Sequence, residues 1–293
     1  MKTFAHLIIF STFVFAVTAD AQSPLTADFR SVVEKRLAKD KLKLEDVCPV
    51  DTNVVAHRIF QDYGAKYVAT SDVKYPTKCV FESEEEVAEF QRGLKTKTAT
   101  IGGRTIELQA EAMNKLLKAQ AAAAKRGLKI TPRGASAARR GFADTHRIWL
   151  SRFEPALNHW TRRGRISAEA AAAARKMQIL DQVAQVIEWE ENDLWFSTGF
   201  NRSIFSSVAA PGTSQHLSML ALDVAEFGNL NVRKILNEHG WYQTIINDTP
   251  HFTFLGLDED ELPERGLRLE FAGQFTFWIP NFPPAEPRPV TKK

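Results

Sequence analysis

Side chains that bind metals recur in a fixed order in the last third of the chain, and this order constrains the fold. His216 and Asp223 lie seven residues apart with mostly apolar residues between them, and His251 opens a later aromatic stretch. A catalytic zinc ion usually takes three protein ligands, imidazole nitrogen or carboxylate oxygen, and keeps a fourth position open. We therefore expect two strands that lie side by side and hold Zn²⁺ between His216, Asp223 and His251.

An acidic residue, Asp248, stands three residues before His251 in the sequence Asp-Thr-Pro-His. Hydrolysis at a metal needs a base that accepts a proton from water. Positions three apart on a regular strand point to opposite faces, so Pro250 must bend the chain for Asp248 to reach the site. Asp248 is the predicted base, and the alternative is a turn residue, because Asp before Pro often forms turns. If Asp248 is not the base, Glu226 and Glu238 are the next candidates.

These motifs resemble those of a known family. Ser214, His216, Ala221 and Asp223, followed by acid-x-x-His ending at His251, are similar to the pattern Ser-x-His-x6-Asp and Glu-x-x-His of VanY-like D-alanyl-D-alanine carboxypeptidases. This family belongs to the zinc peptidase superfamily that also includes hedgehog domains. The resemblance implies zinc binding by the two histidines and the aspartate, and hydrolysis of peptide bonds in peptidoglycan stem peptides or muropeptides.

The chain departs from the family pattern at two positions. Met219 occupies the place of a glycine three residues after the first histidine, and Asp248 replaces the glutamate that the family uses as its base. The first change alters the packing beside the metal site. The second shortens the base by one methylene group, which bears on catalysis more than on zinc binding.

The family also has a substrate-binding arginine on a loop that leads into a helix. Arg140, followed by Gly and Phe, is similar to that segment. An arginine there can bind a carboxylate through two hydrogen bonds or stabilise a developing oxyanion, so Arg140 is predicted as a catalytic and substrate-binding residue. Arg133 is its rival and Arg202 a third choice, and Ser214 in the first motif is also expected to contact the substrate.

Three functions are compatible with these residues. The preferred one is a D,D-carboxypeptidase that removes the terminal residue of a stem peptide. The second is an endopeptidase that cuts within the stem or the cross-link, which would not need a cation for a terminal carboxylate. The third is a non-catalytic wall-binding protein that keeps zinc for its structure.

The N-terminus has the layout of a cleavable signal peptide covering residues 1–21. A basic start precedes an apolar run from Leu7 to Val17, and Ala-Asp-Ala lies directly before Gln22. Such a run is too short to cross about 30 Å of hydrocarbon as a helix, so cleavage is favoured over a membrane anchor. The mature protein is therefore expected in the periplasm or outside the cell. In an exported chain, Cys48 and Cys79 are expected to form a disulfide, and two free buried thiols are the alternative.

Charge and hydropathy argue against two classes of partner. The net charge is only +3, and no block of Lys and Arg is interleaved with aromatic residues, so a nucleic-acid partner is not expected. No later stretch is apolar enough to cross a membrane once the signal is cleaved. The sequence does not indicate an oligomeric state.

Helical and strand-like segments alternate along the chain, which predicts an α+β fold. We expect a small antiparallel sheet that carries the zinc site, flanking helices, and a helical insertion at 160–195 before the zinc motif. The predicted regions are an N-terminal region with the disulfide (22–95), a zinc peptidase domain (96–279) and a Pro-rich tail (280–293). The predicted elements are a hairpin at 98–108 followed by a helix to Lys125, helices at 142–160, 168–190 and 232–239, and strands at 128–131, 194–196, 217–225, 241–247 and 251–256.

Overall fold

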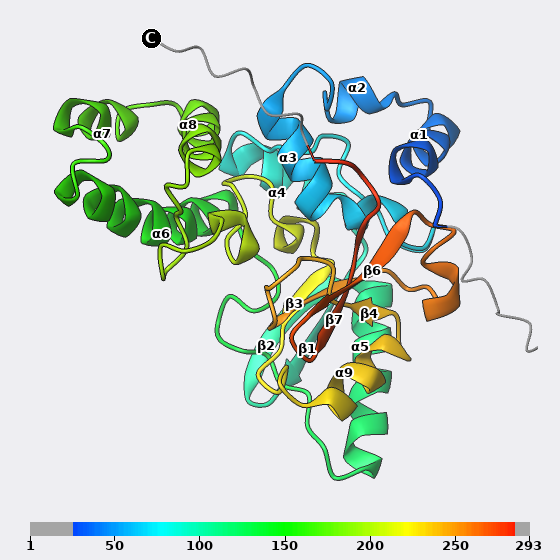
Figure 1. Cartoon of the computed structure of the whole chain (residues 1–293). Helices are drawn as coiled ribbons and strands as arrows, with labels where there is room; N and C mark the ends of the chain where they lie inside the picture. The colour runs from blue at the N-terminus through cyan, green and yellow to red at the C-terminus, as the bar shows by residue number, and fades with distance from the viewer. Residues whose placement is uncertain (1–25, 285–293) are drawn as a thin grey trace, which may run out of the picture.

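The computed structural model describes residues 26–284, in which helices surround three small antiparallel sheets (Figure 1). The α-helices are α1 (Phe29–Lys39), α2 (Leu44–Val47), α3 (Val54–Tyr63), α4 (Glu84–Arg92), α5 (Ala110–Lys125), α6 (Phe142–Arg162), α7 (Ala168–Ala174), α8 (Ile179–Glu191) and α9 (Leu230–Asn237). The short 3-10 helices are η1 (Gly64–Val68), η2 (Ile204–Ser206), η3 (Gln215–Ser218) and η4 (Glu259–Glu261). The predicted signal peptide and the tail beyond residue 284 lie outside the described residues. Within residues 26–284, no helix is long and apolar enough to cross a membrane.

The sheets confirm the predicted α+β class. The central sheet has the order β3 (Ala221–Asp223), β5 (His251–Phe254) and β4 (Trp241–Tyr242), with antiparallel neighbours. Two hairpins complete the set, β1 (Thr96–Ile101) with β2 (Arg104–Gln109), and β6 (Leu267–Ala272) with β7 (Phe275–Pro280). The central sheet is the important one for function, because its register places Asp223 directly opposite His251.

Both ends of the described chain pack on the same hydrophobic core. Phe60 in α3 contacts Phe29 in α1 on one side and Phe282, just after β7, on the other, and both pairs of ring centroids are 4.9 Å apart. The core cluster contains residues from either side of position 95. The division into an N-terminal region and a peptidase domain remains a prediction.

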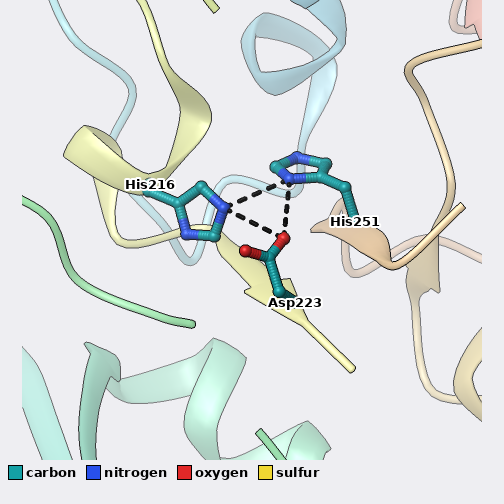
Figure 2. A group of neighbouring side chains, drawn as sticks. All are labelled: His216, Asp223 and His251. Carbon is teal, nitrogen blue, oxygen red and sulfur yellow. Dashed lines mark hydrogen bonds and ion pairs between the residues drawn. The ribbon is translucent and has the colours of Figure 1, made fainter. Parts of the chain in front are cut away.

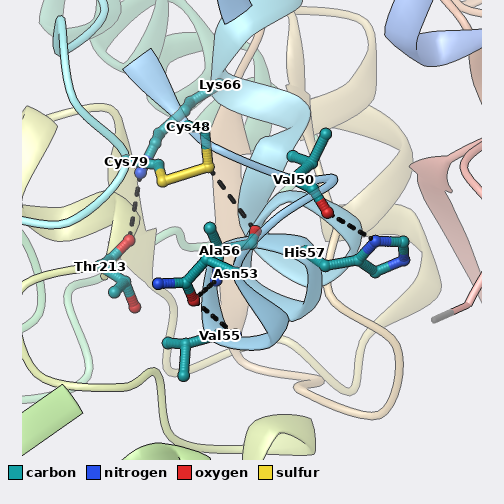
Figure 3. Close-up of a disulfide and its surroundings, with 9 residues drawn as sticks. All are labelled: Cys48, Val50, Asn53, Val55, Ala56, His57, Lys66, Cys79 and Thr213. Carbon is teal, nitrogen blue, oxygen red and sulfur yellow. Dashed lines mark hydrogen bonds between the residues drawn. A yellow bond between two sulfur atoms is a disulfide. The ribbon is translucent and has the colours of Figure 1, made fainter. Parts of the chain in front are cut away.

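The predicted disulfide is present and joins Cys48, after α2, to Cys79 (Figure 3). A bridge across 31 residues restricts the unfolded chain, and loop-closure entropy gives it a stabilising effect of about 3–4 kcal/mol. The same region reaches the predicted zinc motif, because buried Lys66 donates a hydrogen bond of 3.1 Å to the carbonyl of Thr213 (Figure 3).

Local sequence signals account for several elements. The hairpin of β1 and β2 turns at Gly102 and Gly103, which both have positive φ as a tight turn requires. The Ser83 side chain caps α4 by accepting from the amide of Glu86 at 3.2 Å. The predicted helices to Lys125, at 142–160 and at 232–239 are confirmed as α5, α6 and α9.

The long helix predicted at 168–190 is wrong, because it is broken into α7 and α8. Ser167 caps the first piece as expected, with its hydroxyl 3.1 Å from the amide of Ala170. Tertiary contacts then turn the chain back. Gln182 in α8 accepts from the Trp149 indole of α6 at 2.8 Å and donates to the carbonyl of Ala174 at 3.1 Å. These contacts override the helix propensity of the alanine-rich sequence.

Two short predicted strands are also wrong, because acidic side chains accept hydrogen bonds from backbone amides that a strand would use for pairing. At 128–131, the amide and hydroxyl of Thr131 donate to the carboxylate of Glu226 at 2.8 and 2.7 Å. Pairing with the central sheet is limited to an isolated bridge between Pro132 and Val224, in which the carbonyl of Thr131 accepts from Ala225 and the amide of Arg133 donates to Asp223. At 194–196, the amide of Phe196 donates to the carboxylate of Glu190 at 3.2 Å. Strands 217–225, 241–247 and 251–256 exist but are shortened to β3, β4 and β5, and the hairpin of β6 and β7 was not predicted.

Gly212 fixes the segment that leads to His216. Its carbonyl accepts from the amide of Phe81 at 2.9 Å, and its amide donates to the hydroxyl of Thr145 at 3.1 Å. Gly212 has φ +79°, and a Cβ added there would lie 1.9 Å from the carbonyl oxygen of Phe81. Only glycine fits where these three segments meet.

Gly212→Ala is therefore expected to destabilise the protein by about 3 kcal/mol or more, since backbone strain and overpacking each cost about 1–3 kcal/mol. Gly127→Ala is the matched control, because Gly127 also has positive φ but nothing lies within 4 Å of its added Cβ. Chemical denaturation measures both free energies of unfolding. Equal losses for the two variants would contradict the close approach at Gly212.

Candidate metal centre and active-site cavity

The structure brings together the three residues that the sequence predicts as metal ligands. Asp223 ends β3, His251 begins β5 directly opposite it, and His216 comes from η3, just before β3 (Figure 2). One ligand-type atom from each side chain lies within 4.8 Å of the others. The backbone turns between η3 and β3 at Met219, which is fully buried and has a φ of +56°. Glycine adopts this conformation most easily. Here the amide of Met219 donates to the carbonyl of His216 at 3.1 Å, and the carbonyl of Met219 accepts from the amide of Gln109 at 3.2 Å.

The distances between the three atoms fit a tetrahedral metal ion. His216 Nε2 lies 3.2 Å from His251 Nδ1, and Asp223 Oδ1 lies 3.4 Å from each nitrogen. A tetrahedral ion with bonds of about 2.0–2.1 Å separates its ligand atoms by about 3.3–3.4 Å. The triangle therefore has the size of one face of such a tetrahedron.

Hydrogen bonds on the far side of each ring show which nitrogens are free for a metal. His216 Nδ1 is 2.7 Å from the carbonyl of Ala138, and His251 Nε2 is 2.8 Å from Oε1 of Gln215. Both of these nitrogens must carry the proton, since their partners can only accept. In the neutral rings the other nitrogens present lone pairs, which point at each other and at a carboxylate oxygen. A cation between them removes this repulsion.

The ionisation states also suit a metal. Burial lowers the pKa of His216 to about 4, with a further contribution from Arg140, so its imidazole is neutral near pH 7. Burial opposes the ionisation of Asp223, but the neighbouring His216, His251 and Arg140 outweigh it and hold the pKa of this carboxyl well below its usual range. A neutral imidazole and an ionised carboxylate are the forms in which His216 and Asp223 can bind a metal.

Arg140 fixes the orientation of the carboxylate. Its Nη2 donates to Asp223 Oδ2 at 2.5 Å, and its Nε donates to the carbonyl of Ser136 at 2.8 Å. Asp223 therefore presents Oδ1 to the histidines and Oδ2 to Arg140, which favours a single metal–oxygen bond. Within the described residues, Nη1 of Arg140 has no partner and remains able to donate to a ligand.

A cavity of about 280 Å³ opens beside the three residues, and Asp248 lines it. Burial raises the pKa of Asp248 to about 7, and the nearby positive charges of Arg140 and Arg133 act in the opposite direction. Its carboxylate has no hydrogen bond to another described residue. The turn before β5 thus places Asp248 in the same cavity as the ligands, as the bend at Pro250 was expected to do.

The other predicted site residues fall into two groups. Arg140, Arg133 and Ser214 all line this cavity, and Ser214 also accepts from the amide of His216 at 3.4 Å. Arg202 lines a different, neighbouring cavity. The alternative bases do not line the first cavity either: Glu226 is hydrogen-bonded to Thr131, and Glu238 is paired with Arg126.

Sequence reasoning missed Gln215, which lies between two motif residues. It is fully buried, its Oε1 accepts from His251 and Thr253, and its Nε2 donates to the carbonyl of Tyr63 at 3.2 Å. These partners fix both the orientation of the amide and the tautomer of His251. A buried glutamine beside a metal ligand carries no recognisable signal in a single sequence.

Gln215→Leu is expected to weaken metal binding by about 10–100-fold, because partners that orient a ligating histidine usually contribute that much to affinity. Competition with a chromophoric chelator measures the dissociation constant. The control is Gln185→Leu, since Gln185 bonds only to Glu188 on the exposed side of α8. An unchanged affinity in a folded Gln215→Leu protein would show that His251 needs no such partner.

Comparisons with known proteins give only remote likenesses. No family model and no curated protein matches the chain. Among solved structures, it is similar to a mutant of the vancomycin-resistance D,D-pentapeptidase VanY from a VanB-type cassette in complex with Zn(II). The TM-score is 0.36 and the identity 16%, over 66% of this chain and 90% of that one. A second similar structure is VanYB in complex with D-alanine-D-alanine, with a TM-score of 0.34 and 17% identity over 58% of this chain and 83% of that one. Scores this low establish neither a family nor an activity for this chain.

Proposed function

We propose that this protein is a zinc-dependent peptidase of the cell wall, and that it removes the C-terminal residue from stem peptides ending in D-alanyl-D-alanine. The observation that carries the proposal is the face of a tetrahedron formed by His216, Asp223 and His251 beside a cavity that contains an unpaired carboxyl group. Two imidazoles and one carboxylate with an open fourth position are a typical ligand set for catalytic zinc. The sequence motifs give the substrate class. The two structural likenesses agree with it but are too remote to support it.

The side chains that line the cavity have different roles in hydrolysis. Zn²⁺ bound by the three ligands supplies a Lewis acid that polarises a carbonyl group and acidifies water. Asp248 accepts the proton of the attacking water and then donates it to the leaving amine. Arg140 keeps Asp223 in place and directs its Nη1 toward the substrate. The exposed Arg133, which has no ion pair within the described residues, binds the terminal carboxylate.

The disulfide supports export, because such bridges persist in oxidising compartments outside the cytoplasm. We place the protein in the periplasm or outside the cell, where peptidoglycan is the available substrate. This agrees with the signal peptide expected at residues 1–21.

Mass spectrometry of a synthetic pentapeptide incubated with the zinc-loaded protein tests the proposal. The expected product lacks one D-alanine, and neither an L-alanyl-L-alanine version nor a C-terminal amide is cleaved at a comparable rate. Cleavage of the amide, or of cross-linked muropeptides from digested sacculi, would identify an endopeptidase. A zinc-loaded protein that changes no muropeptide would favour a wall-binding role.

A further inference from the structure

The active-site cavity extends away from the metal centre along one face of α6. Thr145, Ile148 and Arg152 line it, with spacings of three and four residues that place them on the same side of the helix. The segment after η2, residues 207–209, also lines the cavity. The cavity thus has lining residues on α6 in addition to those around the metal centre.

Arg152 is the charged group on this extension, and its hydrogen-bonding capacity is largely unused. Its Nη1 contacts only the adjacent Ser151, at 3.0 Å from the hydroxyl. Its Nε is buried without a hydrogen-bond partner. No acidic side chain among residues 26–284 pairs with it, in contrast to Arg140, which bonds to Asp223, and Arg147, which bonds to Asp144.

The charge of the whole cavity favours an anionic ligand. Three guanidinium groups line it, from Arg133, Arg140 and Arg152, against two carboxyl groups, Asp223 and Asp248. Asp223 is already paired with Arg140, and a divalent cation would add two more positive charges. A ligand that carries carboxylates in addition to the terminal one would restore the balance.

The position of Arg152 sets where such a carboxylate would lie. Arg152 follows the first residue of α6, Phe142, by ten positions, which is about 15 Å along the helix. Its side chain leans back toward the N-terminal end of the helix, so the guanidinium lies roughly 10 Å from that end. An extended peptide advances about 3.3 Å per residue. The N-terminal end of α6 lies near the metal centre, because Arg140, two residues before it, bonds to Asp223. A group bound by Arg152 therefore lies roughly two to four residues from the scissile bond.

We propose that Arg152 is a specificity-determining residue that binds a free carboxylate on the acyl side of the substrate, two to four residues before the scissile bond. This inference rests on the proposed carboxypeptidase function, because a carboxypeptidase leaves only one residue beyond that bond. The ligand class is an acidic stem peptide. Its γ-linked glutamyl residue carries a free α-carboxylate, which becomes a neutral carboxamide when the residue is amidated.

The test compares two synthetic stem peptides that differ only in this carboxylate or carboxamide. The wild-type protein is expected to prefer the carboxylate by about 10-fold or more in kcat/KM through a lower KM, as for a charge-assisted hydrogen bond. Arg152→Ala should raise the KM for the acidic peptide and remove the preference, and Arg152→Lys should restore part of it. Arg147→Ala is the control, since Arg147 lies on the same helix, is 67% exposed and does not line the cavity.

The preference should also appear in binding without hydrolysis. Calorimetry with the zinc-loaded Asp248→Asn protein measures the affinity for each peptide directly. If Asp248→Asn binds the acidic peptide more tightly but the wild-type protein cleaves neither peptide, the proposed function is overturned and the subsite is kept. A wild-type protein that cleaves both peptides equally, or an Arg152→Ala variant that keeps the full preference, would overturn the subsite and keep the function. Binding of neither peptide would overturn both.

Discussion

Replacing His216 with alanine is expected to abolish stoichiometric zinc binding. The purified wild-type protein should contain one zinc per chain, held by one atom each from His216, Asp223 and His251. Without His216, two ligands remain on adjacent strands. The interior then has an apolar gap, and Asp223 keeps only Arg140 and His251 as charged or polar partners. Loss of one of three protein ligands leaves too few bonds to compete with hydrated zinc or a chelator.

Elemental analysis after dialysis against a weak chelator measures this effect. His146→Ala is the control, because His146 lies on α6 and does not line the cavity. A second measurement separates metal loss from misfolding. Added zinc should raise the melting temperature of the wild type and of His146→Ala, but leave that of His216→Ala unchanged. Unchanged zinc content in His216→Ala would mean that the metal, if any, is bound elsewhere.

The metal centre could be predicted because its three ligands lie on two short segments that pair directly with each other. Asp223 and His251 each sit at an end of a short apolar strand, so a single antiparallel pairing brings them face to face. His216 lies one tight turn earlier. Few residue types can bind zinc, and the spacing of these three along the chain indicates which of them can lie together. The identity of the metal does not follow from residue spacing alone, since a His-His-Asp set also suits other divalent ions.

The features that sequence could not predict depend on contacts between distant segments. The carboxylate of Glu226 accepts from the amide of Thr131, and the break between α7 and α8 depends on Gln182 bonding to both Trp149 and Ala174. Neither contact leaves a periodic pattern in the sequence. Arg152 was overlooked for a similar reason, since a charged residue on an amphipathic helix is usually exposed to solvent. Only the packed structure shows that this face of α6 borders a cavity.

Arg140 illustrates how geometry refines a residue role taken from a motif. The motif identifies it as a group for the substrate. In the structure, its Nε and Nη2 are both engaged, with Ser136 and Asp223, which leaves Nη1 for a ligand. A bidentate clamp on a carboxylate needs two free donors on one edge. Arg133 is therefore better suited to bind the terminal carboxylate, and Arg140 to hold the metal ligand in place.

Asp248→Asn is expected to retain zinc and lose hydrolysis. Asparagine has nearly the same shape as aspartate but cannot accept the proton of the attacking water, and removal of a general base typically costs about 10²–10⁴-fold in rate. The three metal ligands are untouched, so the zinc content should not change. The rate of D-alanine release from a pentapeptide measures the loss. Glu238→Gln is the control, since Glu238 is an acid on the same chain that does not line the cavity.

Asp248→Glu then tests whether the site is built around the shorter acid. Glutamate extends the carboxyl group by one methylene, in a cavity where Asp248 is half-buried and has no hydrogen bond to another described residue. Near-normal turnover would mean that the turn at Pro250 tolerates either acid, whereas a large loss would mean that the reach of aspartate is matched to the metal centre. Full turnover by the zinc-loaded Asp248→Asn protein would contradict the assignment of Asp248 as the base. Because Glu226 and Glu238 do not line the cavity, that result would leave polarisation by zinc alone as the source of the activity.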